Sequence, residues 1–259
     1  MAARAASFGT VARDYDRLRA RPPGDALHWL LPAGARQVLE LGAGTGLLTL
    51  ELAQRAPRVI AVEPDERMRA VLAEKARRGR GDAVVDVVGA RAEEIPLPAA
   101  SVDVVIAQSA WHWVDEQRGV PEVARVLRPG GRFALAWTGT DRSVDWMRTL
   151  WAGGTEHRAS GRSESDGRMP ARYEVHLDAG GRNDFTDPET AHFRWTQPMA
   201  RADLVALAGT YSAVIAMDDE ERRRHLAGME RFLDSLGHGS EHDVIDVPMR
   251  SYCWRTTRR

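Results

Sequence analysis

The chain has 259 residues, which is long enough for one sizeable α/β domain and short for two full ones. Its formal net charge of −1 provides no basic face for nucleic-acid phosphates, and its single cysteine, Cys253, excludes an internal disulfide and a multi-cysteine zinc site. No apolar run approaches the roughly 18 residues of a membrane span, and the first residues carry no apolar signal core, so we expect a cytoplasmic protein with no membrane partner.

Short β-branched runs alternate with segments of helical spacing through the first half of the chain. Val120, Val123, Ala124 and Leu127 follow the i, i+3, i+4, i+7 pattern of a helix packed on a sheet. Strands are predicted at 38–41, 59–62, 84–88, 102–107 and 132–137. Strand and helix in regular alternation predict a doubly wound, mostly parallel sheet that is covered on both faces.

The alternation of strand and helix signals ends after Trp137. Residues 139–189 are rich in Gly, Ser, Arg and Asp, which indicates an insertion with one short helix near 144–152. Strand signals return at 191–195, and helices are predicted at 202–211 and 218–236. The final segment, 243–259, alternates enough for a last strand.

A glycine-rich turn, Glu40-Leu-Gly42-Ala-Gly44-Thr-Gly46, follows the first predicted strand and opens a helix. Glycine allows positive φ and lets a ligand touch the backbone. A nicotinamide cofactor predicts G-x-G-x-x-G, whereas the third glycine here comes one residue early. The second strand ends in Glu63, placed to accept hydrogen bonds from ribose hydroxyls. That geometry serves NAD and adenosine-type ligands alike, and a solvated acid before a helix is the simpler alternative.

Four segments in series carry a resemblance to a known family: "ELGAGTG", "VEPDERM", "AEEIPLPAASVDVV" and "ARVLRPGGRFAL". In this order and spacing they resemble the class I S-adenosylmethionine-dependent methyltransferases, in particular the type 11 or UbiE-like small-molecule branch. The resemblance covers about residues 36–137. It implies a Rossmann-like α/β fold with a seven-stranded, mostly parallel sheet, an N-terminal helical lid and an insertion after strand five.

The resemblance also implies the cofactor S-adenosyl-L-methionine, with S-adenosyl-L-homocysteine as its product. The glycine turn is expected against the methionine part, with Glu40 near the amino group and Glu63 on the ribose. The full set of implied cofactor contacts is Glu40, Gly42, Ala43, Gly44, Gly46, Glu63, Pro64, Met68, Ala92, Glu93, Gln108, Ser109 and Tyr15.

The adenine side of this pattern departs from the family at one position. Pro64 and Met68 are expected along the adenine and Ala92 with Glu93 at its border. Relatives usually carry Asp where Arg91 stands here. Because a guanidinium cannot accept a hydrogen bond, backbone groups or Glu93 must take over that role.

Methyl transfer from a sulfonium is an in-line substitution in which alignment is the enzyme's main contribution. The loop after strand four reads Gln108-Ser-Ala-Trp-His-Trp-Val-Asp115, and ligands of parallel sheets sit at such carboxyl ends. His112 is the candidate general base, with pocket lining as the alternative. Asp115 is expected to cap the following helix. Candidate substrate contacts are Trp111, Trp113, His192 and Tyr211, and no metal ligands are expected.

We expect one methyltransferase domain over residues 1–259, acting as a monomer or homodimer on a small-molecule metabolite rather than on nucleic acid. Its parts are lid helices (1–30), a cofactor-binding core (31–137), an acceptor-side insertion (138–200), and C-terminal helices with the final strand (201–259). The reaction class is methylation of O, N or C. The alternative is a protein that binds S-adenosylmethionine or S-adenosylhomocysteine without methyl transfer, either a regulatory partner or a lyase or cyclase, since fold does not fix reaction.

Overall fold

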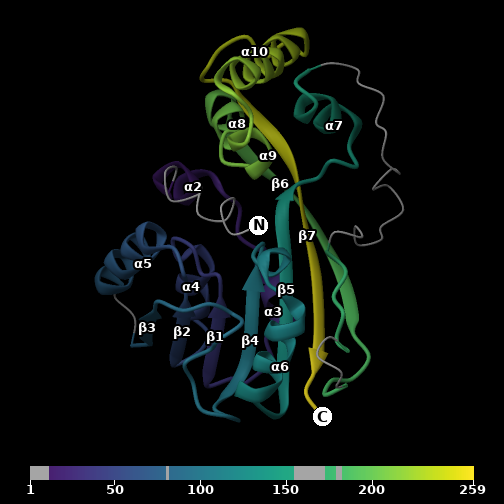
Figure 1. The fold of residues 1–259 in the computed structure, drawn as a ribbon. Coiled ribbons are helices and arrows are strands. Elements are labelled where there is room, and N and C mark those ends of the chain that lie inside the picture. Colours follow the sequence, from purple (N-terminus) through teal and green to yellow (C-terminus); the bar gives the residue numbers. More distant parts are fainter. Residues whose placement is uncertain (1–11, 80–81, 155–172, 179–182) are drawn as a thin grey trace.

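The computed structural model describes residues 12–79, 82–154, 173–178 and 183–259. These residues form one seven-stranded sheet in the order β3-β2-β1-β4-β5-β7-β6 (Figure 1). The strands are β1 (Gln37–Leu41), β2 (Arg58–Val62), β3 (Val84–Val88), β4 (Val102–Gln108), β5 (Leu127–Thr140), β6 (Glu189–Ala200) and β7 (Val244–Thr257). The predicted Rossmann-like fold with a seven-stranded, mostly parallel sheet is confirmed.

The first five strands pair in parallel, and β7 runs antiparallel to both β5 and β6. Because β1 lies in the middle of this order, the chain moves to one edge through β2 and β3 and then crosses back to β4. The turn after β1 and the loop after β4 therefore start from neighbouring strands, at the point where the strand order reverses.

Alternate residues of the central strands enter two separate apolar clusters, one on each face of the sheet. Leu39, Val105 and Phe133 pack on one face with α6 (Glu116–Val126). Val38, Val104 and Ala134 pack on the other face with α3 (Gly24–Leu30) and α4 (Leu47–Leu52). Both faces are covered, as near-continuous apolar strands require.

The N-terminal helices have two different roles, which corrects the expectation that residues 1–30 form lid helices throughout. Ala26, Leu27 and Leu30 of α3 are at most 1% exposed and belong to the main core. By contrast, α2 (Ala12–Leu18) lies between the sheet and the helices at the top of the molecule in Figure 1. Residues 1–11 lie outside the described part.

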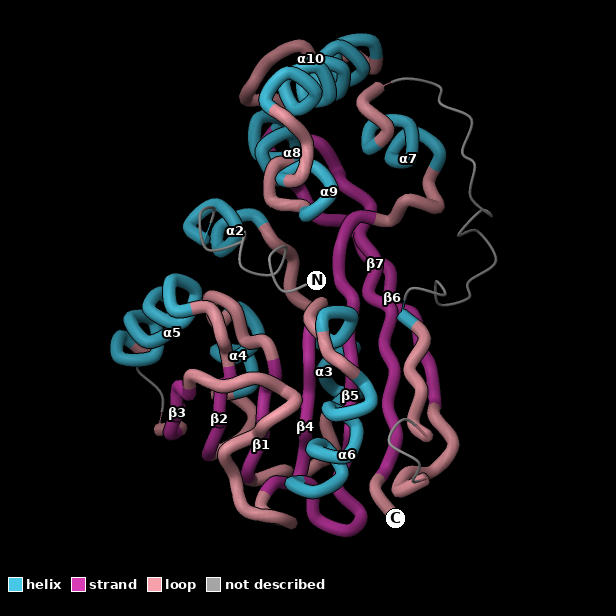
Figure 2. The backbone as a smooth tube through the Cα atoms, viewed as in Figure 1, coloured by secondary structure: helices cyan, strands magenta, loops and turns pink. Residues whose placement is uncertain are grey.

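A third apolar cluster joins the helices that lie beyond the carboxyl edge of the parallel strands (Figure 2). We call these helices the cap. They are α7 (Asp145–Trp151), α8 (Arg201–Ala208), α9 (Ser212–Ile215) and α10 (Asp219–Ser235). Leu18 of α2 packs into the cluster, as do Met199 and Met249 from the long strands β6 and β7. Residues 155–172 of the predicted insertion lie outside the described residues.

The turn between β1 and α4 needs glycine at Gly46, which precedes α4 with φ of 84°. A Cβ built there would lie 2.3 Å from Cδ1 of Leu72, a fully buried side chain of α5 (Glu66–Arg78). Glycine at this position therefore lets α4 start directly against α5.

We expect Gly46→Ala to lower the free energy of unfolding more than Gly34→Ala. Gly34 has a similar φ of 80°, but a Cβ at that position would meet nothing within 4 Å, so it isolates the backbone cost. That cost is roughly 1–2 kcal/mol, and overpacking against Leu72 adds about 1–3 kcal/mol. Urea denaturation of both variants measures the difference, and equal losses would contradict the close approach to Leu72.

Candidate functional site

A large cavity of about 870 Å³ opens at the carboxyl edge of the parallel strands. Its walls come from α2, from the ends of β1, β2, β4 and β5, and from the cap. It is lined by many of the residues predicted from sequence: Tyr15, Gly42, Gly44, Glu63, Pro64, Met68, Ala92, Glu93, Gln108, Ser109, Trp111, His112, Trp113 and Tyr211. Glu40 and Ala43 line a small recess beside it.

The glycine turn and Glu63 form one hydrogen-bonded unit. The Gly44 N–H donates to Oε2 of Glu63 at 2.8 Å, and the Asp65 N–H donates to Oε1 at 2.8 Å. Burial raises the pKa of Glu63, and these two bonds partly offset the effect. A Cβ on Gly44 would meet nothing within 4 Å, so the backbone of this turn is open on that side.

Glu40, at the end of β1, is 1% exposed and accepts a hydrogen bond from Oγ1 of Thr49 at 2.5 Å. Burial raises its pKa to about 8, and the nearby charge of Glu63 pushes it in the same direction. A buried carboxyl group with so high a pKa is suited to bind a cationic ligand group, because a nearby cation stabilises the ionised form of the carboxyl group.

The chain turns toward the cavity at the end of β4. Ser109 has φ of 51°, in the left-handed region that non-glycine residues rarely adopt, and its N–H donates to the Ala136 carbonyl at 2.7 Å. The side chain of Gln108 donates to the Ala20 carbonyl at 3.0 Å. Backbone strain of this kind is typical of functional sites.

Arg91 lines the cavity beside Glu93, with 3.5 Å between Arg91 Nε and Glu93 Oε2. The same carboxylate accepts from the Asp115 N–H at 3.0 Å. Asp115 in turn caps α6 by accepting from the Gln117 N–H, as predicted. Glu93 thus connects the loop after β3 to the loop after β4.

The aromatic side chains of the loop after β4 point in different directions. Trp111 is 2% exposed, donates to Glu116 and packs edge-on against Phe133, with 4.8 Å between ring centroids. Its ring is largely part of the core although Trp111 also belongs to the cavity lining, so the substrate contact of Trp111 stays a prediction. Trp113 is half-buried and lies on the cavity.

His112 lines the cavity and receives a hydrogen bond from Trp137, with 3.3 Å between Nε1 of the indole and Nδ1 of the imidazole. An indole N–H only donates, so Nδ1 accepts and the proton of the neutral ring sits on Nε2. In this tautomer Nε2 is a hydrogen-bond donor. The contact therefore weighs against the predicted role of His112 as a general base.

His192, also predicted to contact substrate, does not line the cavity. It lies on β6 and packs edge-on against Tyr252, with centroids 4.8 Å apart. Tyr252 itself lines the cavity, so His192 stands one layer behind it. Gly46 also lies outside the lining, against Leu72.

The end of the cavity nearest the cap is built from aromatic and arginine side chains. Trp151 and Tyr211 meet edge-on at 4.6 Å, and the guanidinium of Arg142 lies 4.7 Å from the Trp151 ring centroid. Arg19 lies 3.8 Å from the Tyr211 ring centroid and donates to the Thr210 carbonyl at 3.0 Å.

A buried ion pair lies next to this corner. Asp141 and Arg250 are 2% and 3% exposed, with 3.2 Å between Asp141 Oδ1 and Arg250 Nη2. Oδ2 of Asp141 also accepts from Arg194 at 3.0 Å, and Oδ1 accepts from Ser143. Burial alone would raise the pKa of Asp141, but the Ser143 hydrogen bonds and the Arg250 charge outweigh it and hold the pKa below its ordinary value.

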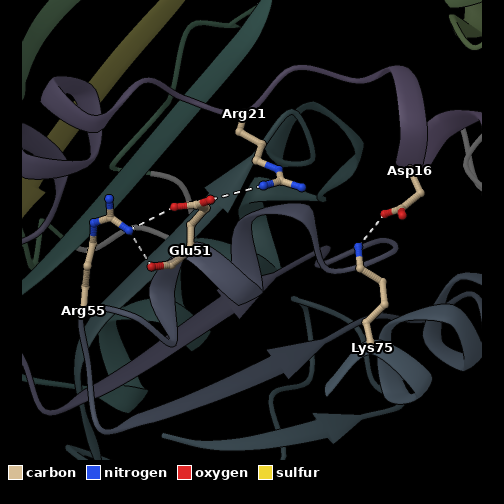
Figure 3. Close-up of polar contacts among 5 residues, drawn as sticks. All are labelled: Asp16, Arg21, Glu51, Arg55 and Lys75. Carbon is tan, nitrogen blue, oxygen red and sulfur yellow. Dashed lines mark hydrogen bonds and ion pairs between the residues drawn. The ribbon is translucent and has the colours of Figure 1, made fainter. Parts of the chain in front are cut away.

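Ion pairs tie the N-terminal segment to the core (Figure 3). Lys75 of α5 contacts Oδ1 of Asp16 at 2.5 Å, and Thr45 in the glycine turn donates to the same oxygen at 2.8 Å. Arg21 contacts Glu51 of α4 at 3.2 Å. These contacts fix α2, and with it Tyr15, at the wall of the cavity.

Sequence reasoning missed the far wall of the cavity. Trp137, Arg142, Tyr173 and Arg250 all line it, and the rings of Trp137 and Tyr173 stack at 4.6 Å. The rule that locates ligands at the carboxyl ends of parallel strands, applied to β5, would have found Trp137 and Arg142. No local signal marks the other two residues.

Among the described residues, no group of three or more His, Cys, Asp and Glu side chains is arranged to hold a metal ion. None of the helices in the described part is long and apolar enough to cross a membrane.

Comparisons with known proteins agree with this geometry. Residues 39–135 match the family model of a methyltransferase domain. An uncharacterized methyltransferase of Mycobacterium tuberculosis is 38% identical over 97% of this chain and 95% of its own length. The structure of a protein described as a type II methyltransferase of Anaeromyxobacter dehalogenans has a TM-score of 0.60 at 30% identity, covering 93% of this chain and 97% of that one.

A more distant structure shares the fold. It is a phosphoethanolamine N-methyltransferase of Haemonchus contortus in complex with phosphomonomethylethanolamine and S-adenosylhomocysteine. Its TM-score is 0.55 at 16% identity, covering 96% of this chain and 57% of that chain.

We expect Asp141→Asn to lower the free energy of unfolding by about 3 kcal/mol, because it leaves the buried Arg250 charge without compensation. Urea denaturation at neutral pH measures this loss. Asp145→Asn is the control, since Asp145 is 89% exposed and its ion pair with Arg148 lies at the surface.

The pH dependence gives a second check on Asp141. A carboxyl group with a lowered pKa contributes stability above its ordinary pKa of about 3.9 and loses it as the pH falls. The difference in free energy of unfolding between the wild type and Asp141→Asn should therefore become smaller below about pH 4. A gap that is independent of pH would contradict the ion pair as its source.

Proposed function

The chain belongs to the class I methyltransferases, within the type 11 group, and from this premise we propose that it transfers the methyl group of S-adenosylmethionine to a small-molecule acceptor. The observation that carries the proposal is the Gly44–Glu63 unit at the edge of the large cavity. It joins an open glycine backbone to a buried carboxylate at the point where the strand order reverses.

The residues present fit this cofactor. The open side of Gly44 leaves room for a ligand against the backbone, and Glu63 lines the cavity with its pKa raised by burial. Glu40 offers a second buried carboxyl group in the recess behind the turn. A ligand with an amino group and a sulfonium is complementary to these two acids. The related fold from Haemonchus contortus binds S-adenosylhomocysteine, which supports the choice.

We assign the contacts as follows. Glu63 binds the ribose hydroxyls, Glu40 the amino group, and the backbone of Gly42–Gly44 the methionine part. Arg19 lines both the cavity and the recess, so it is placed for the cofactor carboxylate. The remaining proposed cofactor contacts are Tyr15, Ala43, Pro64, Met68, Ala92, Glu93, Gln108 and Ser109.

Bound S-adenosylmethionine supplies a methyl group already activated by the positive sulfur. What remains for the protein is to hold the acceptor in line with that methyl group and to exclude water. Trp113, Trp137 and Tyr173 line the cavity and provide an apolar wall for this purpose. His112, with its proton on Nε2, orients an acceptor oxygen by donating a hydrogen bond.

The second candidate function is cofactor binding without methyl transfer. It shares the Gly44–Glu63 unit, so cofactor affinity alone does not separate the two. The size of the cavity favours methyl transfer, because about 870 Å³ holds a second molecule beside the cofactor. Release of S-adenosylhomocysteine from S-adenosylmethionine in the presence of small metabolites separates the two functions. We place the enzyme in the cytoplasm as a monomer or homodimer.

Titration calorimetry with S-adenosylhomocysteine tests the cofactor site. We expect micromolar binding by the wild type and at least about tenfold weaker binding by Glu63→Ala, because a buried ribose would lose its acceptor. Glu74→Ala is the control, since Glu74 lies on the outer surface of α5 in an exposed pair with Arg78. Affinity of Glu63→Ala within twofold of wild type would contradict the ribose assignment, and absence of binding by the wild type would contradict the proposed function.

Glu40 predicts a pH dependence of cofactor binding. Its pKa of about 8 means that most of it is protonated at neutral pH, and a cationic amino group beside it favours the ionised form. We expect S-adenosylhomocysteine affinity to rise between about pH 6 and 8, with proton release on binding. Calorimetry in buffers of different ionisation enthalpy measures the released proton.

In Glu40→Gln, which keeps an acceptor for Thr49, both the pH dependence and the proton release should disappear. Glu51→Gln should keep them, because Glu51 of α4 pairs with Arg21 and Arg55 away from the cavity lining. Equal proton release from both variants would exclude Glu40 as its source.

A further inference from the structure

The charged side chains that line the cavity are divided between its two ends. Glu63, Asp65 and Glu66 follow β2, and Glu93 follows β3 beside Arg91, so four acids and one arginine gather where we place the cofactor. The arginines at the opposite end are Arg142, two residues after β5, and Arg250 on β7, together with Arg19, which lies on the Tyr211 ring. A cationic cofactor at the acidic end leaves a basic end for the acceptor.

The only acid at the basic end of the described lining is already engaged. Both carboxylate oxygens of Asp141 accept hydrogen bonds, Oδ1 from Ser143 and Oδ2 from Arg194, and Oδ1 also forms an ion pair with Arg250. Arg250 is thereby neutralised by a buried partner. Asp141 therefore does not pair with Arg142, although the two residues are adjacent in sequence.

Arg142 instead contacts aromatic rings. Its guanidinium lies 4.7 Å from the centroid of Trp151 and 5.5 Å from that of Tyr211. Within the described part of the chain it makes no ion pair with a carboxylate. Cation–π contacts satisfy the face of a guanidinium and leave its edge of N–H donors available for hydrogen bonds.

His225 of α10 completes this corner without adding charge. It lines the cavity, and its Nε2 is buried with no hydrogen-bond partner among the described residues. Burial lowers its pKa, and the nearby charge of Arg142 lowers it further, so the ring is neutral at pH 7. Apart from Arg19, which also lies on Tyr211 and which we assign to the cofactor carboxylate, the corner therefore presents one cation, Arg142, and a neutral ring with an unsatisfied polar atom.

We propose that the methyl acceptor is a small carboxylic acid and that Arg142 binds its carboxylate, with Trp151 and Tyr211 packing against the body of the molecule. This inference rests on the proposed function. A carboxylate matches the planar fork of one guanidinium, whereas a doubly charged phosphate needs further cations. Arg250 is already paired, and we assign Arg19 to the cofactor carboxylate. A carboxylate group is also ionised at neutral pH, so if it is itself the methyl acceptor the reaction needs no general base, in agreement with a donor at His112 Nε2.

The test uses a deproteinised small-molecule extract of a mycobacterium, the source of the 38%-identical relative. The extract is passed over an anion-exchange resin, and each fraction is incubated with the purified protein and methyl-labelled S-adenosylmethionine. We expect label to enter molecules from the salt-eluted fraction and none from the flow-through. Treating the eluate with phosphatase beforehand should leave the incorporation unchanged. Incorporation from the flow-through only, loss after phosphatase, or no incorporation from either fraction would overturn the proposal.

Variants then assign the effect to Arg142. For the salt-eluted acceptor, Arg142→Gln should raise KM at least about tenfold and leave S-adenosylhomocysteine affinity within twofold, while Arg142→Lys should recover part of the loss. Arg148→Gln, at the surface of α7, is the control and should match the wild type. An unchanged KM in Arg142→Gln would overturn the assignment. A wild type that binds no S-adenosylhomocysteine would instead count against the proposed function.

Discussion

The site depends on the hydrogen bond from the Gly44 N–H to the Glu63 carboxylate, 2.8 Å long, which joins the turn after β1 to the tip of β2. The Val62 carbonyl accepts from both the Gly42 and Ala43 N–H groups and reinforces the same connection. With the turn fixed in this way, α4 starts from Gly46 against Leu72, and the space above β1 and β4 stays open. The Gly44–Glu63 hydrogen bond thus places an acidic side chain and an open stretch of backbone side by side at the cavity.

The site also depends on distant parts of the chain, α2 and the cap, which enclose the space above β1 and β4. α2 is fixed to the core by Asp16 and Lys75 and reaches the cap through Arg19, whose guanidinium lies over Tyr211. The cap helices pack around an apolar cluster of their own, to which β6 and β7 contribute and which is separate from the clusters on the two faces of the sheet. The cavity consequently lies between two packed units, the sheet and the cap, and the N-terminal segment contacts both of them.

The sequence predicted those elements whose signals are local. Strand runs, the glycine turn and the acid at Glu63 each depend on spacing within a few residues, and the sheet and the turn lie where expected. The directions of side chains in the short helix after β4 were not predictable in this way. One 3-10 turn sends Trp111 into the core and leaves Trp113 on the cavity, and only the neighbouring Phe133 and Glu116 decide between them. Arg142 and Tyr211 meet across 69 residues of chain, a pairing that no local pattern encodes.

The position of Arg142 follows from the competition for Asp141. Arg142 is the sequence neighbour of this acid, yet Asp141 is buried and its partners Arg250 and Arg194 come from β7 and β6. Those strands pair in antiparallel register beside β5, so their arginines approach the end of β5 from within the sheet. A charge that is buried must be paired, and the strand arginines meet this need for Asp141. Arg142 is left on the cavity side with aromatic neighbours, and the polarity of the acceptor end is therefore a consequence of how the antiparallel strands β6 and β7 complete the sheet.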